Sequence, residues 1–81
     1  MGGKVWKDKY IDGDFSHKPL AGDVLSGDFT GANFTGADLS GATLSGDFTE
    51  AKFCDADLTG ADLSGTFDDA TCIKSWLRRH R

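Results

Sequence analysis

Large apolar residues recur along this chain at steps of four, five, five and five residues, which add up to a cycle of 19. Residues 25–43 and 44–62 are identical at 13 of 19 positions. An α-helix repeats every 3.6 residues and a β-strand every two, so neither produces this spacing. Internal repetition with a fixed period is typical of a solenoid, in which each cycle forms one coil stacked on the previous one. We therefore predict a four-sided coil that turns a corner about every five residues.

Each five-residue step repeats one pattern of side chains. The large residue should point into the coil, and so should the alanine two positions before it, because residues two apart in an extended segment share a face. Glycine or aspartate two positions after the large residue tolerates turn geometry. Gly27, Gly46 and Gly65 should serve in the four-residue step both as the turn and as the small inward residue. The predicted inward columns are Trp6, Leu25, Leu44 and Leu63; Tyr10, Phe29, Phe48 and Phe67; Phe15, Phe34, Phe53 and Cys72; and Leu20, Leu39, Leu58 and Leu77.

Composition agrees with turns rather than helices. The chain contains 12 Asp but a single Glu, and Asp favours turns and helix caps over helix interiors. No apolar run approaches the roughly 20 residues of a membrane span, and no signal peptide opens the chain. A helical bundle is therefore unfavourable for this composition, and we expect no membrane association.

Four tandem motifs resemble the signature of the pentapeptide repeat family. They are Ala-Asn-Phe-Thr-Gly at 32–36, Ala-Asp-Leu-Ser-Gly at 37–41, Ala-Thr-Leu-Ser-Gly at 42–46 and Ala-Asp-Leu-Thr-Gly at 56–60. The resemblance implies an all-β fold, a right-handed quadrilateral β-helix with 20 residues per coil. This chain drops one residue in every coil, before Phe29, Phe48 and Phe67, so one side of the coil should be tighter. We expect one domain over residues 1–81 with about four coils.

The two ends of the repeat depart from its pattern, as the terminal coils of solenoids do. Residues 1–19 are predicted to form an N-terminal cap or degenerate coil, and residues 20–70 the regular coils. At the start of the repeat, Lys18 and Asp23 occupy small inward positions.

Residues 71–81 are predicted to form a C-terminal cap. Ile73, Trp76 and Leu77 fall at helical spacing after residues that can cap a helix, which predicts a short helix. The alternative is a fourth coil that continues through Cys72 and Leu77 and leaves Trp76 outside. Because open sheet edges pair readily, Ile73, Trp76 and Leu77 are also our candidate surface for a homodimer or for end-to-end association.

The two cysteines are predicted to point in opposite directions. Cys54 follows a large inward residue and should face out, whereas Cys72 takes the place of an inward phenylalanine. We therefore predict no disulfide between them. Two thiols and no signal peptide favour a reducing compartment, the cytoplasm.

No catalytic pattern stands out. His17 and His80 lie in opposite terminal segments, and no Ser or Cys has a histidine base at motif spacing. Gly-rich phosphate loops and metal-ligand spacings are absent from the sequence as well. We expect no enzymatic activity, no catalytic or cofactor-binding residue, no cofactor and no metal.

Charge is distributed unevenly along the chain. Residues 20–70 hold ten acids and one base, for a net −9, whereas residues 1–19 sum to +1 and residues 71–81 to +4. The predicted register stacks Asp28 on Asp47 and Asp38 on Asp57. Like charges at a coil spacing of about 5 Å repel. The simplest interpretation is that Asp suits this position and keeps a small solenoid soluble. The alternative is an acidic interaction face made of Asp28, Asp38, Asp47, Asp57 and Asp62.

These features favour a small non-enzymatic protein-binding or scaffold module whose protein partner the sequence does not identify. The resemblance implies one alternative, an acidic DNA mimic that binds or inhibits DNA gyrase or another type II topoisomerase. Four coils would make a rod only about 20 Å long, which disfavours that alternative. A surface-adsorbing face of threonine rows, such as ice binding needs, is disfavoured because the outward rows are mixed. Direct binding of nucleic acid is not expected, since the acidic body repels phosphates.

Overall fold

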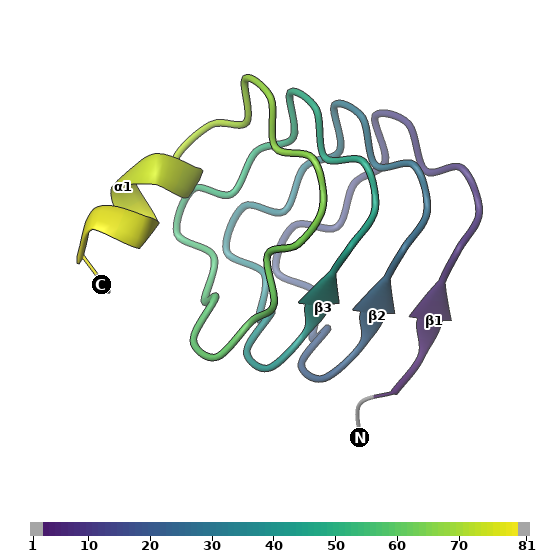
Figure 1. Ribbon diagram of the computed structural model, residues 1–81, viewed down its shortest axis with the longest axis horizontal. Coiled ribbons are helices and arrows are strands. Elements are labelled where there is room, and N and C mark those ends of the chain that lie inside the picture. Colours follow the sequence, from purple (N-terminus) through teal and green to yellow (C-terminus); the bar gives the residue numbers. More distant parts are fainter. Residues whose placement is uncertain (1–2, 80–81) are drawn as a thin grey trace.

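The computed structural model describes residues 3–79, and the chain winds through it in stacked coils (Figure 1). Strands β1 (Val5–Trp6), β2 (Val24–Leu25) and β3 (Thr43–Leu44) form a parallel sheet in the order β1-β2-β3. Their registers pair each residue with the one 19 positions later. The 19-residue cycle of the sequence is therefore the turn of the coil.

Further backbone bridges extend the same register around the coil. All of them are parallel and join residues 19 apart, in four columns: Lys9, Asp28, Asp47 and Thr66; Asp14, Asn33, Lys52 and Thr71; Pro19, Asp38 and Asp57; and Thr43 with Asp62. Within the described residues these bridges define coil 1 (4–22), coil 2 (23–41), coil 3 (42–60) and an incomplete coil 4 (61–71). The predicted stacking of coils at a period of 19 is thus confirmed, whereas four complete coils are not.

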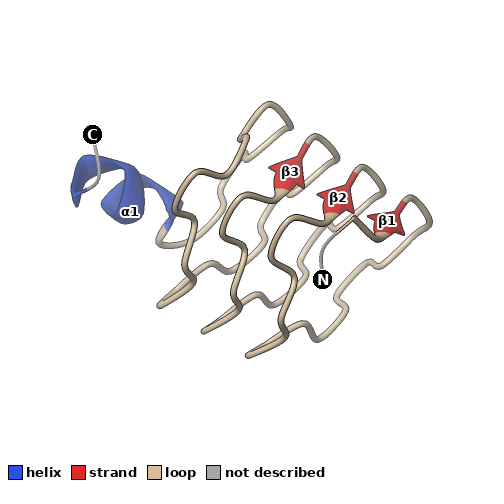
Figure 2. Ribbon diagram, turned by 90° about the horizontal axis from the view of Figure 1, so that it is seen from below, coloured by secondary structure: helices blue, strands red, loops and turns tan. Residues whose placement is uncertain are grey.

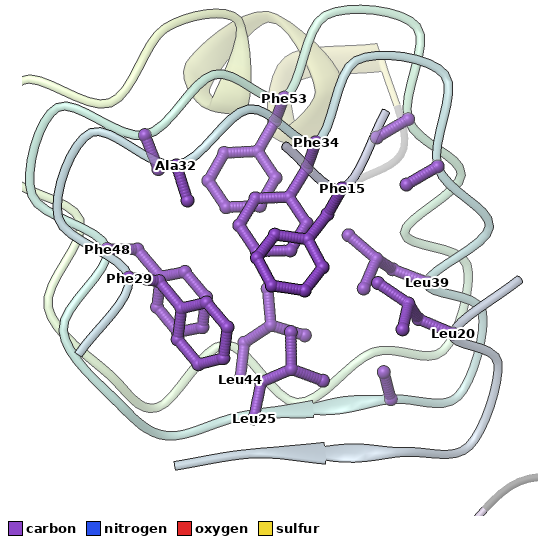
Figure 3. Packing of buried hydrophobic residues seen from close by; sticks show 14 of the residues in the cluster. Phe15, Leu20, Leu25, Phe29, Ala32, Phe34, Leu39, Leu44, Phe48 and Phe53 are labelled. Atoms are coloured by element: carbon purple, nitrogen blue, oxygen red, sulfur yellow. The ribbon is translucent and has the colours of Figure 1, made fainter. Parts of the chain in front are cut away.

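Aromatic rings and leucines fill the interior in columns that run along the stack (Figure 3). Phe48 lies parallel to Phe29 and to Phe67, with ring centroids 5.1 Å apart in both pairs. Phe34 stacks on Phe53 at 5.2 Å. The small positions predicted to face inward are also buried, at Ala32, Ala37, Ala42, Ala51 and Ala56. The predicted columns are confirmed except for the last member of two of them, Cys72 and Leu77.

The corners of the coil are of two kinds. Three corners hold a residue with positive φ, in the columns Asp12, Gly31, Glu50 and Asp69; His17, Gly36 and Asp55; and Gly22, Gly41 and Gly60. The fourth corner is the shortened one and has Gly27, Gly46 and Gly65. A Cβ on Gly46 would overlap the carbonyl oxygen of Gly27 in the coil below. The missing residue therefore brings successive backbones into contact at a place that only glycine fits.

The C-terminal end closes with helix α1 (Ile73–Arg79), at the end of the stack opposite β1 (Figure 2). The predicted helix is confirmed, and the alternative of a coil through Cys72 and Leu77 is wrong. Cys72 has φ 66° and turns the chain out of the coil. Ile73, only 3% exposed, joins the hydrophobic core instead, and Leu77 is 40% exposed. Cys72 and Leu77 therefore do not complete the columns assigned to them.

The N-terminal end is held by a buried carboxylate. Asp23 is 5% exposed, and its oxygens accept hydrogen bonds from the Trp6 indole Nε1–H at 3.1 Å and the Lys4 backbone N–H at 3.2 Å. The Lys4 ammonium lies over the Trp6 ring, 4.0 Å from its centroid. Lys18, the other irregular residue of this end, is exposed. Asp23, which departs from the repeat, thus links coil 1 to coil 2 through these hydrogen bonds.

Candidate functional site

Most of the candidate acidic residues first serve their own loop. Oδ1 of Asp28 accepts hydrogen bonds from the backbone N–H of Thr30 at 3.1 Å and from its hydroxyl at 2.7 Å. The same two-bond contact, which we call the staple, joins Asp14 to Ser16, Asn33 to Thr35, Asp38 to Ser40, Asp47 to Thr49 and Asp57 to Thr59. The staple fixes each side chain at the surface. Our sequence reasoning missed it, although the spacing of Asp or Asn two residues before Ser or Thr is visible in the repeat.

The structure brings the predicted acids together as two pairs. Asp28 bridges to Asp47, and Asp38 bridges to Asp57, as the register predicted. We call these the first and second carboxylate ladders. Lys9 and Thr66 flank the first ladder, and Pro19 precedes the second. Each ladder is therefore two carboxylates long within the described residues.

The five acids do not lie on one face of the coil. Asp28 directly precedes Phe29 and Asp38 directly precedes Leu39, and Figure 3 shows Phe29 and Leu39 on opposite sides of the interior. Asp62 bridges to Thr43, on the side that carries β3. The first ladder, the second ladder and Asp62 thus occupy three different sides, so a flat partner can engage only one of them at a time.

Hydrogen bonding favours the ionised form of Asp28 in the first ladder. The Thr30 hydroxyl, followed by the Thr30 backbone N–H and the charge of Lys9, lowers the pKa of Asp28 below its ordinary value of 3.8. The Ser16 hydroxyl and backbone N–H lower the pKa of Asp14 in the same way. Donors aimed at a carboxylate favour its charged form. The staples at Asp14 and Asp28 therefore stabilise the negative charge of these two side chains.

The residues predicted for self-association are divided between the core and the surface. Ile73 is buried, and Trp76 is partly buried and packed against the core. Leu77 alone of the three is exposed, on a helix that carries the exposed basic residues Lys74, Arg78 and Arg79. Two of the three residues thus close the end of the stack, and self-association through this segment stays a prediction.

Cys54 and Cys72 form a disulfide, contrary to our sequence prediction. Their Cα atoms lie 5.0 Å apart, within the range for a disulfide. The prediction placed Cys72 inside the coil by extending the period. Instead, the positive φ at Cys72 turns its side chain toward the outward-facing Cys54 in coil 3. The argument from two free thiols to a reducing compartment therefore no longer holds.

Other kinds of site were searched for in the same part of the chain. Among residues 3–79, no group of three or more His, Cys, Asp or Glu side chains is placed to hold a metal ion, and no pocket is found. No helix in that range is long and apolar enough to cross a membrane.

Comparison with known families identifies the repeat. The family model described as pentapeptide repeats matches residues 28–46 and 47–79, with eight copies. These two segments cover more than half of the chain, and they begin after the irregular first coil. No curated protein and no solved structure matches the chain significantly.

Proposed function

The chain belongs to the pentapeptide repeat family, and from that premise we propose that it is a right-handed quadrilateral β-helix that acts as a non-enzymatic protein-binding or scaffold module. Its proposed binding surface is the first carboxylate ladder, Asp28 and Asp47, and its partner is a protein surface rich in Lys and Arg. The cytoplasm stays a prediction from the sequence, and the Cys54–Cys72 disulfide counts against it.

The observation that carries this proposal is the staple on both residues of the ladder. Two hydrogen bonds hold each carboxylate, and the backbone bridge holds the two carboxylates in adjacent coils. Groups already fixed in the geometry of the complex lose little conformational entropy on binding. A row of fixed carboxylates is therefore well suited to pair with a basic protein surface. A row that served solubility alone would not need fixed carboxylates.

Asparagine substitution separates charge from structure in this fold. Asn33 makes the same staple as the aspartates, with Thr35 donating at 3.0 and 2.6 Å. The variant Asp28→Asn/Asp47→Asn should therefore keep the coil and remove two charges. Asp38→Asn/Asp57→Asn is the matched control, because it removes two charges from the opposite side of the coil.

The test is capture of basic protein partners from a lysate by the immobilised chain, followed by titration of each captured partner with the two variants. We expect the first variant to weaken binding at least tenfold and the control to change it less than threefold. Equal loss in both variants would show that net charge, not the ladder, drives binding. No loss in either would remove the ladder from the proposal.

The second candidate function is mimicry of DNA toward DNA gyrase or another type II topoisomerase. It is favoured by the two carboxylate ladders on opposite sides of the coil, as phosphates lie on two sides of a duplex. The longest axis of the molecule is 30 Å, which is shorter than one duplex turn of about 34 Å. Mimicry therefore ranks second. Inhibition of supercoiling that both asparagine variants weaken would favour mimicry over the single-ladder module.

A further inference from the structure

The repeat changes at three positions that meet in space. In coils 1 and 2 the staples of the second bridge column are Asp14 with Ser16 and Asn33 with Thr35. Coil 3 has Lys52 and Cys54 at the corresponding places, so this staple is lost. Cys54 is instead bonded to Cys72, one residue beyond the column. A covalent link to the next coil thus stands where a link within the coil is usual.

This link lies at the boundary between the coils and the cap. The second bridge column ends with Lys52 and Thr71, and the Thr71 backbone N–H donates to the Ala51 carbonyl at 2.9 Å. The next residue, Cys72, has a positive φ, which is unfavourable for a residue with a Cβ. Helix α1 begins directly after it. The disulfide therefore connects the residue that precedes helix α1, which lies outside the backbone bridges, to coil 3.

Helix α1 depends on that connection more than the coils do. It has seven residues, and isolated helices shorter than about 12 residues are marginal in water. Ile73 is its one buried residue and Trp76 is partly buried, whereas its other residues are exposed. Both cysteines are half-buried, and neither belongs to the buried hydrophobic core.

We propose that Cys54–Cys72 is a reversible redox site, reduced by a dithiol, and that its reduction releases α1 from the end of the stack. A dithiol thiolate attacks one sulfur, a mixed disulfide forms, and the other cysteine leaves as a thiolate that takes up a proton. The second thiol of the reductant then resolves the mixed disulfide. Two electrons and two protons pass to the protein, and the reductant ends as a cyclic disulfide. This proposal does not depend on which partner the ladders bind.

Proteolysis can measure release of α1 and unfolding of the coils in one experiment. Trypsin cleavage after Lys74 frees the peptide that begins at Ser75, and cleavage after Lys52 requires coil 3 to open. We would compare the oxidised chain, the chain treated with dithiothreitol, and Cys54→Ser/Cys72→Ser, with mass spectrometry of both cleavages. Iodoacetamide adducts on the treated chain report whether the folded protein is reduced.

We expect cleavage after Lys74 to accelerate about 100-fold in the reduced chain and in the serine variant, the scale set by a cross-link over 18 residues. Cleavage after Lys52 should stay within threefold, and reoxidation should restore protection of Lys74. Parallel acceleration at both sites would overturn the proposal, because the disulfide would then stabilise the whole stack. Unchanged cleavage after Lys74, or failure of the folded chain to take up two adducts, would overturn it as well.

Discussion

The central coils and the C-terminal end of this chain are stabilised in different ways. In coil 2, Phe29 has an aromatic neighbour 19 residues before it and another 19 residues after it. At the C-terminal end the neighbouring column of Phe15, Phe34 and Phe53 stops at Phe53, and Ile73 and the disulfide provide the contacts beyond it. Contacts between equivalent residues of successive coils thus stabilise the interior of the stack, whereas each end needs contacts that the repeat does not provide. It follows that the cost of a substitution should depend on the coil it falls in as much as on the residue type.

The largest effect should come from the middle of an aromatic column. Phe48 is fully buried and stacked between Phe29 and Phe67. Its replacement by alanine should lower the free energy of unfolding by about 3–5 kcal/mol, about the whole stability expected of so small a core. We expect Phe48→Ala to be unfolded by circular dichroism.

Phe67→Ala is the matched variant at the end of the same column, where the ring is only partly buried. It should remain folded and lose about half as much free energy of unfolding in urea titration. Equal destabilisation of the two variants would contradict the distinction between interior and end.

The two kinds of corner should also respond differently to a methyl group. Gly46→Ala places a Cβ against the Gly27 carbonyl oxygen and should cost about 3 kcal/mol, at the upper end for overpacking. At Gly41 a Cβ meets nothing within 4 Å, but φ is +67°, so alanine should cost about 1 kcal/mol. Urea titration of both variants measures the difference. A smaller loss at Gly46 than at Gly41 would show that the tight corner relaxes.

A third prediction compares a carboxylate at the N-terminal end with one on the regular coils. Asp23→Ala leaves the Trp6 indole and the Lys4 amide without their acceptor and should cost about 2 kcal/mol. Asp38→Ala removes an exposed staple and should cost less than about 1 kcal/mol. Thermal unfolding at constant pH provides both values. If Asp38→Ala were the more damaging, the staples rather than the buried carboxylate would dominate.

Much of the regular fold could be predicted because its physics is local and repeated. The period of 19 sets the register, so the stacking of Phe29 on Phe48 and the need for glycine at position 46 follow from spacing and size alone. The paired positions of Asp28 and Asp47 follow as well. The register also predicts that the two ladders lie on different sides of the coil. This step requires that residues ten positions apart be assigned to opposite sides.

The ends could not be predicted in the same way because each depends on a single departure from the period. A positive φ at Cys72 shifts the chain by one residue and exchanges the inward position of Cys72 for that of Ile73. The disulfide depends on that shift. At the N-terminal end, Asp23 departs from the repeat pattern. Its role as a hydrogen-bond acceptor is evident only once the structure places Trp6 next to it. The coincident changes at Lys52, Cys54 and Cys72 were the one sequence signal available.

The smallest expected effect tests whether the staple controls the charge of the ladder. The hydroxyl of Thr30 is the largest cause of the lowered pKa of Asp28, so Thr30→Val should raise that pKa toward 3.8 without reaching it, because the Thr30 backbone N–H still donates. Thr49→Val, which removes the corresponding hydroxyl at Asp47, is the control and should leave the pKa of Asp28 nearly unchanged. Titration of the side-chain carboxyl carbons by NMR measures both.

The sign of the pH dependence follows from the direction of the shift. A carboxyl whose pKa is lower in the folded chain than in the unfolded chain stabilises the fold above the unfolded value and loses that contribution as pH falls through the folded value. The wild-type chain should therefore lose stability below about pH 4, and Thr30→Val should lose less of its own stability over that range. A steeper acid loss in Thr30→Val than in the wild type would contradict this prediction, because it would mean that the Thr30 hydroxyl does not favour the charged form of Asp28.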